Sequence, residues 1–364
     1  MKNKILSILF ACILFSVSAF CWLKPHSVYS ESERRLLSEK PALTMDALLS
    51  GDFMKAFESA CADQFPFRDS FRTVKALFAT YALQKTENNG LYYADEHISK
   101  IEYPQNPQMI DNAEDKLKFI YDTYLSETDV KTYLSIIPDK NYFLAKKNGY
   151  PSLNYEKLTS DFSGRFENMQ YIDIFPLLSI DEYYNTDSHW RQECIVDVAE
   201  HLADVMGANN KTSYTVNELE TPFRGVYLGQ SALPVKPDTI KYLTSDTLLS
   251  SKVFYLDTGK PVAGALYNME KGHGKDPYEL FLSGTSALIE IHNPNAKTDK
   301  ELVIFRDSFG SSLAPLMVEG YRKVTVVDIR YIQSNFLGAF IKFDNQDVLF
   351  IYSTTILNNS MSFR

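Results

Sequence analysis

Cysteine is scarce in this sequence, and metal-binding spacings are missing. Four cysteines occur among 364 residues, and Cys12 and Cys21 lie in an apolar N-terminal segment. With no CxxC pair and no histidine-rich cluster, a structural metal site has no support, and we expect neither a metal nor a cofactor. Whether the other two, Cys61 and Cys194, form a disulfide stays open, because a sequence does not give their distance.

Blocks of basic residues are also missing. The net charge is −9 and the pI is about 5.3, which argues against a nucleic-acid partner. Aromatic residues are plentiful, at 13% of the chain. Sugar-binding surfaces use such residues, but core packing uses them as well, so composition leaves both interpretations open.

Long uncharged hydrophobic runs are confined to the N-terminus. Residues Ile5–Leu23 carry no charge and follow Lys2 and Lys4. The length suits either a membrane anchor or the core of a secretory signal. Residues 17–19 are compatible with cleavage, but the run continues to Leu23, which favours retention. In both cases we expect everything after residue 24 to lie outside the cytoplasm, at the cell membrane or secreted.

The rest of the chain is expected to form two parts after the 1–24 segment. Residues 25–110 read as a juxtamembrane spacer and a helical entry module with a hairpin, and we assign them no chemistry. Residues 111–364 read as a catalytic domain, with an insertion of loops and hairpins at about 207–285.

Short apolar runs alternate with helix-compatible segments from residue 111 onward. This alternation predicts an α/β fold with a mainly parallel sheet and helices on both faces. Helices are expected at about 111–125, 152–168, 190–205 and 332–340, and strands at Thr132–Ile137, Tyr171–Ile174, Leu302–Phe305, Val324–Val327 and Val348–Tyr352.

Ser308 directly follows one of these buried runs. A hydroxyl placed there would lie at the carboxyl edge of the sheet, where the next helix aims its N-terminal N–H groups. Asp187 and His189 lie two residues apart, so in an extended segment they point to the same side. Asp187 would then hold one imidazole nitrogen while the other takes a proton from Ser308. The side chain of Trp190 would line this site and exclude water from it.

Each of these residues also has a structural interpretation. Ser308 alone is compatible with a helix cap, and Asp187 with an N-cap for the helix near Trp190. Arg330 and Tyr331, just past a strand, are candidates to bind an anionic or sugar group, although an arginine at such a position is more often the ion-pair partner of a neighbouring carboxylate, here Asp328.

Lys140, at another strand end, is a further candidate for binding substrate. A surface ion pair with Asp139 is the alternative.

The Asp-x-His-Trp motif resembles that of the AlgX/AlgJ and DHHW proteins, which are SGNH-hydrolase-like polypeptides of the cell surface. A second histidine is replaced by Ser188, which is closer to the AlgX/AlgJ form. The similarity covers most of the exported chain and extends to residues 63–69, 137–140, 306–309 and 327–331.

The resemblance implies an SGNH-hydrolase-like (flavodoxin-like) fold. It also implies that Ser308 is the nucleophile, His189 the general base and Asp187 the residue that orients it. AlgX and AlgJ transfer acetyl groups to alginate, so the resemblance implies acyl transfer to an exopolysaccharide hydroxyl without identifying the glycan. The second oxyanion donor, beyond the backbone N–H of Ser308 or its neighbour, stays open.

We therefore expect a membrane-anchored, extracytoplasmic O-acyltransferase, specifically an O-acetyltransferase, acting on a cell-envelope or secreted polysaccharide. The resemblance suggests that a membrane acyltransferase partner supplies the acyl donor. Two alternatives stay open: a carbohydrate esterase or deacetylase with the same triad, and a glycan-binding surface protein without turnover.

Overall fold

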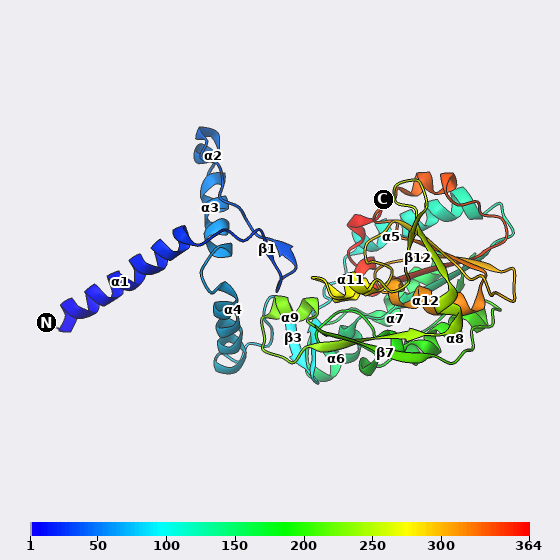
Figure 1. The fold of residues 1–364 in the computed structure, drawn as a ribbon, viewed down its shortest axis with the longest axis horizontal. Coiled ribbons are helices and arrows are strands. Elements are labelled where there is room, and N and C mark those ends of the chain that lie inside the picture. The colour runs from blue at the N-terminus through cyan, green and yellow to red at the C-terminus, as the bar shows by residue number, and fades with distance from the viewer. Residues whose placement is uncertain (1) are drawn as a thin grey trace. The chain divides into compact units, whose positions relative to one another are not determined.

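The computed structural model describes residues 2–364, which divide into two compact units (Figure 1). Unit 1 comprises residues 2–89 together with residues 228–236. Unit 2 comprises residues 90–227 and 237–364. The hairpin expected near residue 90 is present as β3 (Leu91–Ala94) and β4 (His97–Lys100), and it belongs to unit 2.

Unit 1 begins with the apolar helix α1 (Lys2–Leu23). Its stretch Lys4–Cys21 is long and apolar enough to cross a membrane and is not buried, which fits an anchor or a signal sequence. The expected helices follow, and Pro66 stands in the break between α3 and α4. The remaining elements before residue 89 are β1 (Tyr29–Ser30), β2 (Arg35–Leu36), α2 (Met45–Ser50), α3 (Asp52–Asp63), α4 (Arg68–Leu77) and a π-helical turn (Phe78–Ala82).

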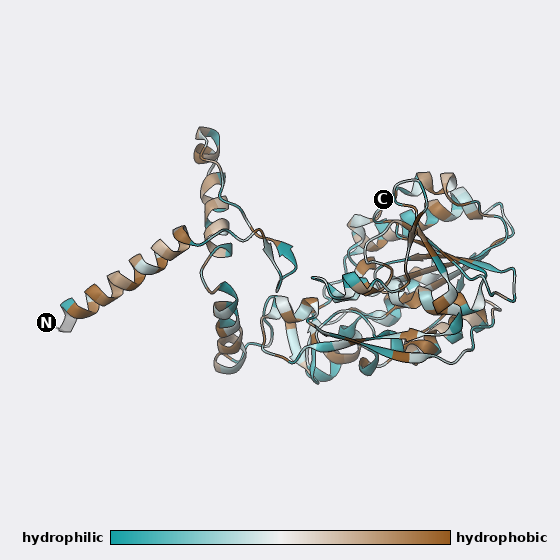
Figure 2. Ribbon diagram, in the orientation of Figure 1, coloured by the Kyte–Doolittle hydropathy of each residue, from teal (hydrophilic) through white to brown (hydrophobic). Residues whose placement is uncertain are grey.

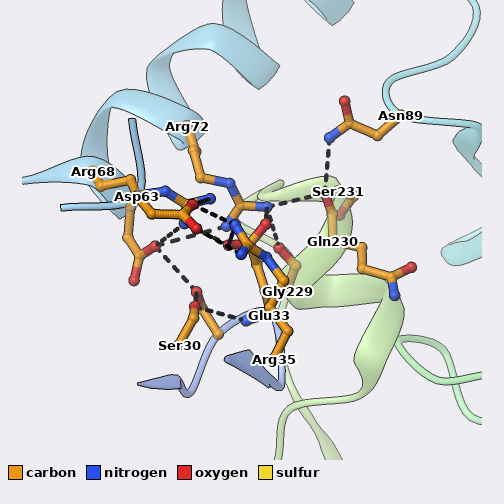
Figure 3. A network of polar contacts seen from close by, with 12 residues as sticks. Ser30, Glu33, Arg35, Asp63, Arg68, Arg72, Asn89, Gly229, Gln230 and Ser231 are labelled. Atoms are coloured by element: carbon orange, nitrogen blue, oxygen red, sulfur yellow. Dashed lines mark hydrogen bonds and ion pairs between the residues drawn. The ribbon is translucent and has the colours of Figure 1, made fainter. Parts of the chain in front are cut away.

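A network of charged side chains holds unit 1 together (Figure 3). Glu33 pairs with Arg68 at 2.5 Å and with Arg72 at 3.3 Å, while Arg35 pairs with Asp63 at 2.5 Å. Arg72 also donates to the carbonyl oxygens of residues 229 and 230, at 2.8 and 3.2 Å. The network thus joins three stretches that are far apart in the sequence, namely the β1–β2 turn, α4 and residues 228–236.

Unit 2 is built on an eight-stranded sheet with the order β10-β9-β11-β13-β12-β14-β5-β6. The five strands from β13 to β6 pair in parallel, and β11, β9 and β10 extend one edge in antiparallel pairings. The bounds are β5 (Lys131–Ile137), β6 (Gln170–Tyr171), β9 (Lys252–Tyr255), β10 (Val262–Gly264), β11 (Leu288–His292), β12 (Glu301–Arg306), β13 (Lys323–Val327) and β14 (Asp347–Ser353).

Helices cover both faces of this sheet, as the alternating pattern predicts. In β12, Leu302 and Ile304 join one apolar cluster, and Val303 and Phe305 join the other, so the strand is buried on both faces. The first cluster contains residues of α8 (Val196–Val205) and α12 (Gly310–Met317), and the second contains residues of α5 (Pro107–Ile120) and α7 (Tyr155–Gly164). Figure 1 shows α5 and α12 on opposite sides of β12.

Two expected elements differ from the prediction. The strand at 171–174 stops at Tyr171, because the Asp173 carboxylate accepts the N–H of Phe175 and turns the chain. Residues Ser334–Ala339 form a 3₁₀ helix that contains Gly338, a poor residue for an α-helix.

The region 207–285 is not only an insertion. It contains a separate hairpin of β7 (Thr215–Phe223) and β8 (Asp238–Thr244), but it also supplies β9 and β10 to the main sheet. Its short helices are α9 (Val226–Ser231), α10 (Asp246–Ser250) and α11 (Met269–Gly272).

Candidate active site

Ser308 lies in the tight turn between β12 and α12, at the carboxyl edge of the parallel strands. The buried carboxylate of Asp307 fixes this turn by accepting the N–H of Phe309 at 3.0 Å and the N–H of Ser353 at 2.8 Å. Because Ser353 ends β14, the turn is tied to two adjacent strands. The hydroxyl of Ser308 makes no cap for α12, whose N-cap residue is Phe309, and the residue is partly exposed.

The structure brings Asp187, His189 and Ser308 into one hydrogen-bonded chain. His189 Nδ1 lies 2.6 Å from Asp187 Oδ1, and His189 Nε2 lies 2.8 Å from Ser308 Oγ. Asp187 is buried, whereas 14% of the His189 side chain is exposed. A proton on Nδ1 satisfies the carboxylate and leaves Nε2 as the acceptor for the serine hydroxyl. Asp187 does not cap a helix near Trp190, since α8 begins only at Val196.

Backbone groups on either side of Asp187 are also held. Its second oxygen accepts the N–H of Val226 at 2.8 Å. The carboxylate of Asp238, the first residue of β8, accepts the N–H groups of Asn185 and Thr186 at 2.9 and 2.8 Å. Gly225 crosses this segment so closely that a Cβ atom would lie 2.2 Å from the carbonyl oxygen of Thr186. The acid is therefore fixed by residues from a hairpin that sequence reasoning treated as an insertion.

Lys140 has a different place from the one predicted. The residue is only 2% exposed, and its ammonium donates to the carbonyl oxygens of Ile98, Tyr184, Asn185 and Asp187 at 2.6 to 3.1 Å. Burial lowers the pKa of Lys140 to about 7, although the charges of Asp238 and Asp187 oppose this shift. The four carbonyls occupy Lys140, so the expected contact with substrate does not fit, and neither does a surface ion pair.

Trp190 is also placed differently from the prediction. It is fully buried, and its indole N–H lies 3.1 Å from the carbonyl oxygen of Phe309 and 2.9 Å from Ser312 Oγ. Its ring meets that of Phe309 edge-on, with centroids 5.4 Å apart. Trp190 thus supports the turn that carries Ser308 from inside the core, and it offers no exposed surface to a substrate.

Arg330 pairs with Asp328, which is the structural alternative to binding a ligand. The guanidinium donates to both carboxylate oxygens of Asp328, from Nε at 2.8 Å and from Nη2 at 2.6 Å. Tyr331 is 44% exposed, and its ring centroid lies 5.5 Å from the guanidinium carbon. Within residues 2–364, no hydrogen bond joins either side chain to the triad. Tyr331 stays accessible, whereas Arg330 is largely occupied.

Tyr278 is a site residue that sequence reasoning missed. Its ring stacks on the imidazole of His189, with centroids 3.9 Å apart and planes 10° from parallel. Its hydroxyl lies 3.0 Å from Ser312 Oγ and 3.3 Å from the carbonyl oxygen of Ser308. The residue lies in a short 3₁₀ helix (Pro277–Leu280), and Asp276-Pro277 is a recognisable helix start. Nothing in the sequence links this start to a histidine almost ninety residues earlier.

All four cysteines are free thiols in this structure. Cys61 and Cys194, the two that follow α1, are therefore not joined by a disulfide. Burial raises the pKa of the Cys194 thiol to about 11, so it is protonated at neutral pH.

Comparisons with known proteins show what this fold resembles. No family model matches the sequence, and no curated protein matches it. Among solved structures, a DHHW family protein from Eubacterium siraeum matches with a TM-score of 0.61 at 19% identity, covering 76% of this chain and 95% of that chain. PatB1 of Bacillus cereus matches with a TM-score of 0.59 at 16% identity, covering 73% and 96%.

The O-acetyltransferase domain of Pseudomonas putida AlgJ also matches, with a TM-score of 0.45 at 14% identity, covering 74% of this chain and 92% of that chain. The DHHW family protein thus matches one of the two groups named by the sequence resemblance. At these identities the two stronger matches establish architecture: this chain has the fold of the DHHW family protein and of PatB1.

Proposed function

We propose that this protein is an extracytoplasmic O-acyltransferase that transfers an acetyl group to a hydroxyl of a cell-envelope or secreted polysaccharide. The observation that carries the proposal is the unbroken chain Asp187–His189–Ser308, with contacts of 2.6 and 2.8 Å. A serine hydroxyl is a weak nucleophile until a base takes its proton, and this arrangement supplies both the base and the group that orients it.

In the first half-reaction, Ser308 Oγ attacks the carbonyl carbon of the acyl donor while His189 Nε2 takes the hydroxyl proton. The tetrahedral intermediate collapses as the bond to the donor's leaving group breaks, and His189 returns the proton to that group. The product is an acetyl ester on Ser308. Asp187 stabilises the imidazolium that forms between these two transfers.

The negative oxygen of the tetrahedral intermediate needs a hydrogen-bond donor. Within residues 2–364, no hydrogen bond involves the backbone N–H of Ser308. The following N–H groups are occupied: Phe309 donates to the Asp307 carboxylate, and Gly310 donates to the Asp307 carbonyl. We therefore assign the Ser308 N–H as one oxyanion donor.

In the second half-reaction, a sugar hydroxyl gives its proton to His189 and attacks the acetyl-enzyme. Ser308 leaves with that proton, and the sugar carries the ester. The resemblance to AlgX and AlgJ supports a polysaccharide as the acceptor, and the apolar helix α1 supports a place at the membrane outside the cytoplasm. A membrane acyltransferase partner would then present the acyl donor.

The test is acetyl transfer by the purified full chain. The protein is incubated with a chromogenic acetyl ester, with and without oligosaccharides from bacterial cell envelopes, and acetylated sugar is followed by mass spectrometry. We expect acceptor-dependent formation of acetylated sugar, and Ser308→Ala should abolish both ester cleavage and transfer.

Two results would overturn this proposal. Acetate release that is unaffected by acceptor, with no acetylated sugar formed, would make the protein an esterase. Oligosaccharide binding without any ester cleavage would make it a glycan-binding protein.

A further inference from the structure

A stripe of exposed apolar side chains runs along α4 and the π-helical turn that follows it. Phe67, Phe71, Val74, Phe78 and Tyr81 recur at intervals of four and three residues, so they share one helical face. Between 57% and 72% of each of them is exposed. We call this set the α4 stripe. A helix normally buries such a face, whereas in unit 1 more than half of each of these side chains is exposed.

The opposite face of the same helix is the one that packs. Ala76 and Ala79 are buried there. Arg72 points into the charged network around Glu33 and donates to the carbonyl oxygen of Gly229. The orientation of α4 within unit 1 is therefore set by its polar side, and it leaves the stripe facing outward.

The stripe is continuous with the apolar helix α1. The ring of Phe67, at the start of the stripe, stacks on the ring of Phe20 with centroids 6.1 Å apart and planes 4° from parallel. Phe20 lies near the end of the stretch Lys4–Cys21 that is long enough to cross a membrane. Figure 2 shows brown, hydrophobic residues along α1 and again on α4. The C-terminal end of α1 and the first residue of the stripe are therefore in direct contact.

Resting on the membrane location in the proposed function, in which α1 would span a lipid bilayer, we propose that the α4 stripe lies in the outer surface of that bilayer. Four of its five residues are aromatic, and aromatic side chains are enriched where hydrocarbon meets the headgroups. An amphipathic helix of this kind lies in the plane of the interface, with its apolar face among the acyl chains and its polar face toward protein or water. The membrane would thus hold unit 1 at two places, a crossing helix and a helix lying flat beside it.

The experiment places tryptophan at two neighbouring positions of the full-length chain. Val74→Trp lies in the stripe, and Lys75→Trp lies one residue further on, about 100° around the helix. Both are made in a Trp22→Phe background and reconstituted in bilayers whose acyl chains are brominated close to the headgroups. Bromine quenches tryptophan only at close contact, so a tryptophan is quenched only where it reaches the brominated part of the acyl chains, and Trp190 in the core supplies a constant background.

We expect brominated lipid to reduce the Val74→Trp emission about twofold or more, and the Lys75→Trp emission much less. Phe78→Trp, a more conservative change within the stripe, should behave like Val74→Trp. Equal quenching at positions 74 and 75, or none at either, would overturn the proposal. A blue-shifted emission that is unquenched and shifts back on dilution would also overturn it, because the stripe would then cover a second copy of the chain.

Discussion

At the scale of single residues, the proposed chemistry depends on how firmly Asp187 is held. One carboxylate oxygen meets His189 Nδ1 at 2.6 Å, and the other accepts the N–H of Val226 at 2.8 Å. An acid held at both oxygens has one orientation available, so it fixes the imidazole in the tautomer that leaves Nε2 free.

Replacing Asp187 by Asn should therefore lower kcat by about a hundred- to ten-thousand-fold while the fold persists. The amide can donate to Nδ1, which favours the tautomer with the proton on Nε2, where it cannot accept the proton of Ser308. Steady-state ester cleavage measures the loss, and Asp181→Asn, at an exposed carboxylate, is the matched control. Activity within a few fold of wild type would remove Asp187 from the mechanism.

A second prediction at this scale concerns the ring of Tyr278. Its ring stacks on the imidazole of His189, with ring centroids 3.9 Å apart. Its hydroxyl instead hydrogen-bonds to the Ser312 hydroxyl and to the carbonyl oxygen of Ser308. Tyr278→Ala should lower kcat about fivefold, because losing an aromatic contact of this kind costs on the order of 1 kcal/mol. Tyr278→Phe keeps the ring and should lose much less. If both variants lose the same activity, the hydroxyl matters and the stack does not.

The sequence alone predicts Ser308, His189 and Asp187 as candidates because each stands at a recognisable place, a strand end or an alternating pair. It cannot predict Tyr278, whose contact with His189 depends on how the region 207–285 folds back. It also gives Lys140 and Trp190 the wrong role. A polar residue beside a motif reads as accessible, but burial decides whether its donors face a substrate or the protein's own carbonyls.

At the scale of structural elements, the loop 184–187 that carries Asp187 is held between the buried side chain of Lys140 and the partly buried carboxylate of Asp238, which come from different elements. The ammonium of Lys140, the first residue of α6 (Lys140–Asn148), donates hydrogen bonds to carbonyl oxygens of the loop. The carboxylate of Asp238 in β8 accepts hydrogen bonds from N–H groups of the loop. A loop with both kinds of backbone group satisfied in this way needs no regular secondary structure to stay in place.

Lys140→Met should lower the free energy of unfolding of unit 2 by roughly 3 kcal/mol or more, because each carbonyl left buried without a donor costs about 1–3 kcal/mol. Denaturant unfolding measures the change. Lys146→Met, at an exposed lysine of the same helix, should change stability by less than about 0.5 kcal/mol. Equal effects of the two substitutions would contradict the role given to Lys140.

The pH dependence of this difference is a further check. Burial lowers the pKa of Lys140 from 10.5 to about 7, so between these values the unfolded chain binds a proton that the folded chain lacks. The contribution of Lys140 to stability therefore rises with pH in this window, by up to about 1.4 kcal/mol per pH unit. The gap between wild type and Lys140→Met should widen from about pH 7 to about pH 9, and a gap that narrows would contradict the assignment.

The parallel part of the sheet is predictable because strands buried on both faces leave short apolar runs that end sharply, as β12 and β14 do. The antiparallel edge is not predictable in this way. Strands β9 and β10 are short and partly exposed, and they stand in a region rich in turn-forming residues. Their membership of the sheet is decided by pairing with β11, which is a tertiary contact.

At the scale of the whole molecule, we assign membrane attachment to unit 1 and the proposed chemistry to unit 2. Unit 1 carries the apolar helix and the α4 stripe, and unit 2 carries the proposed triad of Asp187, His189 and Ser308. A membrane location would put the enzyme beside a donor delivered through the bilayer and beside glycans of the envelope. The proposed function joins both roles, but it depends on one chemical event, the acylation of Ser308.

That event can be observed directly. PatB1, which shares this fold, has been seen with a sulfonyl adduct. We predict that a sulfonyl fluoride adds one sulfonyl group to this protein, that peptide mass spectrometry places the group on Ser308, and that prior incubation with the acetyl ester slows the labelling. His189→Ala should label far more slowly, and Ser308→Ala should not be labelled. A group found on another residue, or labelling that persists in Ser308→Ala, would contradict the account.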